Sequence, residues 1–142
     1  MRVGILLCLS LVLALSPAAR TQPQSFDVAE ATIADIHAAM RAGRLTCSAL
    51  VSAYLARIEA HDKRGAALNA IVQINDAAPR EAADLDRRFA ATGLTGPLHC
   101  IPTIVKDNFE TIGLQSAAGS LALQGFVSDR DAFLVARIKS AG

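Results

Sequence analysis

The spacing of apolar residues changes repeatedly along this chain, and the order of the changes limits the folds that are open to it. Helical spacing comes first, strand-like alternation follows, and the two then alternate once more before a last helix. The predicted helices are residues 33–42, 46–58, 77–92 and 131–139, and the predicted strands are residues 68–75 and 101–106. This order predicts an α/β fold in which helices cover a central sheet.

Capping residues mark the predicted ends of these helices. Thr32 is an N-cap candidate, and Asp35 follows three residues later, which is the spacing of a capping box. Asp76 is predicted to cap the third helix. Gly43 and Gly93 are natural stops, because glycine adopts the left-handed conformation that ends many helices.

Composition excludes several classes of protein. The chain has 142 residues, of which 52% are hydrophobic and 19% charged, as expected of one globular domain rather than a disordered chain. The net charge is only +1 and no basic block is present, so no nucleic-acid partner is expected. No two histidines have the spacing of metal ligands, so no metal site is predicted.

The first 18 residues are predicted to be a cleaved secretory signal peptide. A positive start at Arg2 precedes an apolar run at residues 4–15, and small residues follow it at the position that a signal peptidase reads. The run is shorter than the roughly 20 residues of a membrane-spanning helix, so no stable membrane insertion is expected after cleavage. An uncleaved N-terminal anchor is the alternative. Residues 19–30 are then a lead-in, residues 31–142 form the domain, and the expected location is secreted or periplasmic.

Cleavage at this point leaves two cysteines, Cys47 and Cys100, in the mature chain. An oxidising compartment would permit one disulfide between them. Two buried free thiols fit the sequence equally well, and both possibilities stay open at this stage.

The residues from 96 to 120 carry the best candidate for chemistry. An apolar strand at 101–106 ends in Lys106, and Asp107 and Asn108 follow it directly. The carboxyl ends of strands are where open α/β sheets bind ligands. A lysine there can hold an anion, or act as a base if desolvation lowers its pKa from ~10.4 to ~7.5. It can also simply extend into water without a function.

Five segments of the chain resemble one family of enzymes in both sequence and order. They are residues 31–62, 68–86, 96–111 (GPLHCIPTIVKDNFET), 116–123 (SAAGSLAL) and 131–142. Together they are similar to the N-terminal part of the amidase signature family, the serine amidohydrolases with a Ser–cis-Ser–Lys triad. The resemblance implies an incomplete portion of that fold, which has a mixed central sheet covered by helices. It implies no cofactor.

The resemblance also implies roles for individual residues. Lys106 matches the triad lysine, which takes a proton from the nucleophilic serine through a second serine. Asp107 and Asn108 match its neighbours, for which turn and hydrogen-bonding roles are expected. Ser120 lies in the small-residue loop and is expected to shape that loop or to help position substrate. Cys100 stands where the family usually has glycine.

The expected activity is hydrolysis of a carboxamide to an acid and ammonia or an amine, with a small-molecule or peptide amide as substrate. In the family both triad serines lie downstream of the position that Gly142 matches, so this portion is expected to be inactive alone. One alternative is a non-catalytic secreted protein that retains half an amidase fold. Another is transamidation like that of amidotransferase A subunits, which the signal peptide argues against because that reaction is cytoplasmic.

Overall fold

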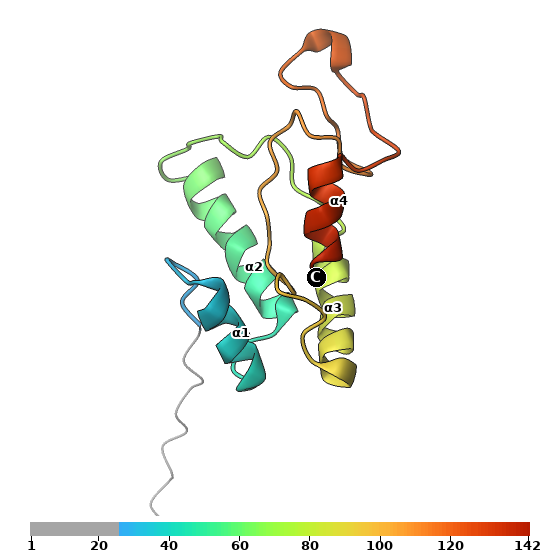
Figure 1. Ribbon diagram of the computed structural model, residues 1–142. Helices are drawn as coiled ribbons and strands as arrows, with labels where there is room; N and C mark the ends of the chain where they lie inside the picture. Colours follow the sequence, from blue (N-terminus) through green and yellow to red (C-terminus); the bar gives the residue numbers. More distant parts are fainter. Residues whose placement is uncertain (1–25) are drawn as a thin grey trace, which may run out of the picture.

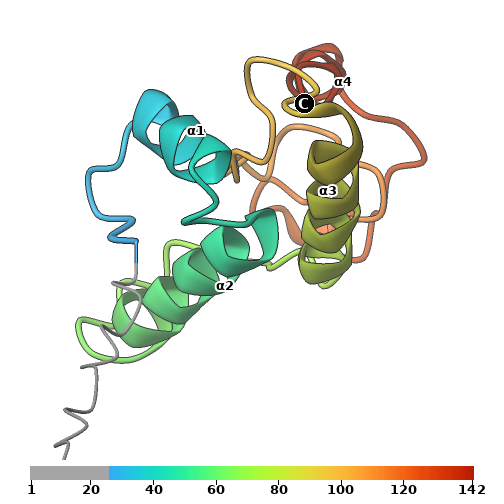
Figure 2. The ribbon, with the colours of Figure 1, turned by 90° about the horizontal axis from the view of Figure 1, so that it is seen from below.

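The computed structural model describes residues 26–142, and the regular structure within them is helical. The elements are α1 (Ile33–Arg41), α2 (Cys47–Arg57), the π-helical turn η1 (Ile58–Lys63), α3 (Ala78–Thr92), the 3-10 turn η2 (Leu121–Leu123) and α4 (Phe133–Ser140). Figures 1 and 2 show α1 and α2 on one side of the molecule and α3 and α4 on the other. The predicted signal peptide and residues 19–25 of the predicted lead-in lie outside the described residues.

The predicted capping box at the start of α1 is confirmed. The Asp35 amide donates to Thr32 Oγ1 at 3.1 Å, and the Thr32 amide donates to the Asp35 carboxylate at 3.1 Å. Together the two bonds satisfy donors that the first turn of a helix otherwise leaves free. The helix ends at Arg41, and the chain then reverses through Gly43, whose φ of +66° suits glycine.

The start of α2 was predicted correctly, whereas that of α3 was not. Thr46 caps α2, but the carboxylate of Asp86 on α3 also accepts the first two amides of α2, from Cys47 at 2.6 Å and from Ser48 at 3.0 Å. The prediction that Asp76 caps α3 is wrong. The N-cap is Ala77, whose amide donates to the Asn75 side chain at 2.9 Å.

Neither predicted strand forms a ladder within residues 26–142, where the only pairing is an isolated antiparallel bridge between Gln115 and Val127. A strand is defined by hydrogen bonds to a neighbouring strand. Residues 102–105 make no backbone–backbone hydrogen bond, and the amides of Ala70 and Ile71 donate to the Asp62 carboxylate instead. The expected α/β sheet is therefore absent from the part of the chain that is described.

The core lies where α1, α2 and α3 meet. Leu50 of α2 and Ala39 of α1 are completely buried, and Ala82 of α3 is 2% exposed. Leu85 and Phe89 of α3 pack against this cluster, as their helical spacing predicts. Residues 100–107 leave the core and run between the two helix pairs (Figure 1).

Candidate active site

Lys106 lies at the end of an irregular segment, and its side chain is exposed. Ile101 and Val105 are partly buried, whereas Pro102, Thr103, Ile104 and Lys106 are exposed, so strand-like alternation survives only in part and without a ladder. Ile104 is 78% exposed, which is unusual for so apolar a side chain. The described residues thus do not provide the dry surroundings that a neutral lysine requires.

A groove of about 920 Å³ runs beside Lys106. Its walls come from α2, α3, α4 and two irregular segments, residues 70–75 and residues 100–107. Most of the lining side chains are apolar, with Lys106 and Asp107 among the few charged ones. Such a groove is the default location for a ligand in a domain of this size.

The far end of the lysine-bearing segment is tied to the small-residue loop through Asp107. The Ala117 amide donates to the Asp107 carboxylate at 3.0 Å, and the Ala118 amide donates to the Asp107 carbonyl at 3.3 Å. Asn108 lies exposed in the turn that follows. This pairing brings residues 107 and 117 together across ten positions of sequence.

Ser120 stands at the N-terminus of η2 and is exposed. Its amide donates to the Ala117 carbonyl at 2.8 Å, so its backbone stabilises the loop. Ser116, in contrast, is 7% exposed, and its hydroxyl donates to the Phe109 carbonyl at 3.3 Å. The structure brings Asp107 to this loop but shows no direct contact between Lys106 and either serine.

The near end of the segment is held by a buried cluster around His99. Cys47 on α2 and Cys100 form a disulfide with a Cα–Cα distance of 5.6 Å. His99 is completely buried, and its Nε2 lies 3.7 Å from the sulfur of Cys47. His37 of α1 donates from Nε2 to the His99 carbonyl oxygen at 2.9 Å. Three elements therefore converge on the turn that precedes the lysine-bearing segment.

Burial lowers the pKa of His99, and the charge of the nearby His37 lowers it further, while Asp86 partly offsets both effects. The neutral form of the ring is therefore favoured in the folded chain. Its Nδ1 contacts the Thr95 hydroxyl at 2.8 Å, which leaves Nε2 directed at the sulfur of Cys47.

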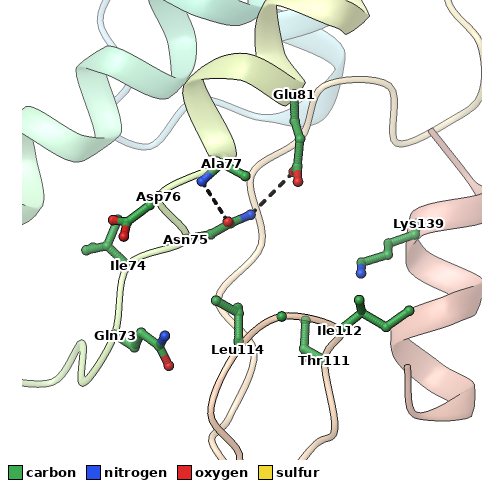
Figure 3. Close-up of a pocket in the computed structure, with 11 residues that line it drawn as sticks. Gln73, Ile74, Asn75, Asp76, Ala77, Glu81, Thr111, Ile112, Leu114 and Lys139 are labelled. Carbon is green, nitrogen blue, oxygen red and sulfur yellow. Dashed lines mark hydrogen bonds between the residues drawn. The ribbon is translucent and has the colours of Figure 1, made fainter. Parts of the chain in front are cut away.

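A smaller pocket of about 310 Å³ opens between the start of α3 and α4 (Figure 3). Asn75 lies at its rim, donating from Nδ2 to the Glu81 carboxylate at 3.3 Å. Lys139 enters from α4 on the opposite side, but its ammonium is paired with Asp131 at 2.8 Å. Lys106 does not line this pocket, so the groove remains the better candidate for the site.

Two further findings concern metal binding and membrane insertion in residues 26–142. No group of three or more histidine, cysteine or acidic side chains lies close enough to hold a metal ion. No helix in this range is long and apolar enough to cross a membrane.

Sequence reasoning missed His99 and Asp86 as structural centres. His99 lies within the segment 96–111 but was given no role of its own. Asp86 lies 39 residues from the helix start that it caps. A buried histidine beside a cysteine carries no local sequence signal. For Asp86, an acidic residue on the core-facing side of an amphipathic helix was the available clue.

Comparison with known proteins places these features in a family. The model of the amidase family matches residues 49–142. A probable amidase from Arabidopsis thaliana is 38% identical over 144 residues, which cover 97% of this chain and 28% of the relative. The A subunit of glutamyl-tRNA(Gln) amidotransferase from Alkalilimnicola ehrlichii is 35% identical over a stretch that covers 80% of this chain and 23% of the subunit.

The crystal structure of native peptide amidase from Stenotrophomonas maltophilia matches with a TM-score of 0.76 and 47% identity, over 80% of this chain and 23% of that one. The described part of the chain thus matches a portion of the amidase fold. The chain belongs to the amidase signature family. It spans about a quarter of the length of these relatives.

Proposed function

We propose that this chain is the N-terminal portion of an amidase and supplies the general base, Lys106, for hydrolysis of a carboxamide to an acid and ammonia or an amine. The observation that carries the proposal is the family match over residues 49–142, which includes the whole lysine-bearing segment. Lys106 lines the groove of about 920 Å³, which is a suitable place for a substrate. The serine nucleophile is assigned to polypeptide outside residues 1–142.

The exposed apolar side chains beside Lys106 support a further part of this proposal. Ile104 and Val72 are 78% and 77% exposed, and residues 102–105 have unpaired backbone groups. In the complete amidase domain these residues would pair with neighbouring strands of a mixed sheet. The added strands would cover the apolar side chains and remove water from Lys106, which favours its neutral form.

A peptide amide is the proposed substrate class. Its support is the 47% identity with a peptide amidase, against 33–39% with amidotransferase A subunits. The signal-like residues 1–18 support the same choice, because they favour a secreted or periplasmic enzyme over a cytoplasmic transamidase. We accordingly propose that these residues are removed during export and that residues 31–142 belong to the amidase domain.

The test is ammonia release from a C-terminal peptide amide by the protein expressed from its complete reading frame. Lys106→Ala is expected to lower kcat by a factor of roughly 10²–10⁴, the usual contribution of a general base. Arg44→Ala is the control, because Arg44 is an exposed cation that does not line the groove and should leave turnover unchanged.

The other possible outcomes each support a different conclusion. Unchanged turnover in Lys106→Ala would remove the assigned base. Transfer of ammonia to a glutamyl-tRNA without free release would favour transamidation. Absence of either reaction in the unmodified protein would favour the non-catalytic alternative.

A further inference from the structure

The Cys47–Cys100 disulfide joins the first residue of α2 to the turn before the lysine-bearing segment. We propose that it is a positioning element for Lys106: it fixes the near end of the lysine segment, residues 100–107, so that this segment is held in place only after the two thiols have been oxidised. The inference rests on the proposed function of Lys106, but its test below does not need catalysis.

The lysine segment depends on its ends because its middle has no hydrogen-bonded support. Residues 102–105 form no backbone–backbone hydrogen bond within the described chain. At the far end, Asp107 is held by the amides of residues 117 and 118. At the near end, the covalent link from Cys100 to the first residue of α2 is the strongest restraint. Loss of that link leaves the segment anchored firmly at one end only.

The backbone of Cys100 shows why a covalent link is needed at this place. Its φ is +64°, in the left-handed region where any residue other than glycine is disfavoured. Cysteine is thus an unfavourable choice for the turn itself. The side chain compensates by reaching α2 across 53 positions of sequence, which glycine cannot do.

The same geometry explains when the bond forms. Cys47 and Cys100 are 1% and 4% exposed, so neither sulfur is accessible to an external thiol once the chain has folded. Oxidation therefore belongs to folding. Each bond needs one molecule of a small disulfide: the two thiols lose two electrons and two protons, the S–S bond forms, and the external disulfide is reduced to two thiols. An oxidising compartment supplies such an oxidant.

The experiment compares the oxidised chain with two variants that lack the bond. Cys47→Ser with Cys100→Ser removes the link and keeps a side chain at the left-handed position. Cys47→Ser with Cys100→Gly removes the link and restores the favoured residue there. Nitrogen-15 relaxation reports the mobility of the lysine segment. Carbon-13 dimethylation of the lysines reports their surroundings separately for Lys63, Lys106 and Lys139.

In the oxidised chain, alkylation with iodoacetamide after denaturation without reductant should leave Cys47 and Cys100 unmodified. The amide order parameters of residues 103–105 should be near 0.85. In both variants these order parameters should fall below about 0.6, the range of flexible backbone. The dimethyl signal of Lys106 should shift, while that of Lys63, which lies on η1, should not.

Three results would overturn the proposal. Alkylation of Cys47 and Cys100 after denaturation without reductant would show that the bond is absent. Identical order parameters and an unmoved Lys106 signal in the variants would show that the bond does not position the segment. Global unfolding of both variants, the glycine variant included, would make the bond a determinant of overall stability instead. Failure of the Lys106→Ala activity test alone would remove the catalytic role and leave the positioning result intact.

Discussion

Removal of the Cys47–Cys100 bond should cost this chain a large part of its stability. The bond closes a loop of 53 residues, and the loss of loop entropy in the unfolded chain corresponds to about 4 kcal/mol. Folded domains have total stabilities of roughly 5–15 kcal/mol, so the Cys47→Ser/Cys100→Ser variant should be close to marginal. Its melting temperature should fall by roughly 10–15 °C, as measured by circular dichroism without reductant.

The glycine variant divides this cost into two parts. The left-handed φ of Cys100 disfavours serine at this position by about 1 kcal/mol relative to glycine. The Cys47→Ser/Cys100→Gly variant should therefore be the more stable of the two by about that amount. A double-serine variant within about 1 kcal/mol of the oxidised chain would refute the loop-entropy argument. Equal stabilities for the serine and glycine variants would refute the argument from φ.

Two further predictions concern the cluster around this bond. The pKa of His99 is lowered in the folded chain, chiefly by burial, so the stability that depends on its neutral form is fully present above the unfolded pKa of ~6.5 and is lost as the pH falls below it. Melting temperatures measured between pH 8 and pH 5 should show this decline. His99→Gln should make the decline smaller, whereas His61→Gln, at an exposed histidine, should leave it unchanged. Equal dependence of the melting temperature on pH in all three proteins would contradict the role given to His99. Asp86→Ala should destabilise the chain by about 1–2 kcal/mol in urea unfolding, because the first two amides of α2 lose their acceptor. Asp84→Ala, at an exposed ion pair on the same helix, should change stability by less than about 1 kcal/mol, and an equal loss in the two variants would exclude the capping explanation.

The helices were predictable from sequence because their determinants are local. The Thr32–Asp35 capping box and the stop at Gly93 each lie within a few residues of the helix end that they define. The start of α3 was misplaced by a residue because its N-cap is Ala77, which has no side-chain capping bond, and Asn75 accepts from the Ala77 amide in the turn before the helix. Asn and Asp both favour turns, and sequence alone does not distinguish which one faces the helix.

The strands could not be predicted in the same way, because a strand requires a partner. The alternation at residues 101–106 holds for Ile101 and Val105, which are partly buried, but fails at Thr103, which is exposed. It does not show whether a neighbouring strand is present. The link between Cys47 and Cys100 was left open for a similar reason, since a separation of 53 positions carries no geometric information. Lys106 was found because of family resemblance, whereas its strand context alone left three interpretations.

The cap that Asp86 provides for α2 has a consequence for the synthesis of this protein. The first two amides of α2 are made 39 and 38 residues before the carboxylate that accepts them. At elongation rates of 5–20 residues per second, a ribosome needs roughly 2–8 s to add the missing partner. During that interval the nascent helix begins with Thr46 as its only side-chain cap. Slow translation across residues 48–86 would therefore prolong the time in which this helix start is exposed to water and to chaperones.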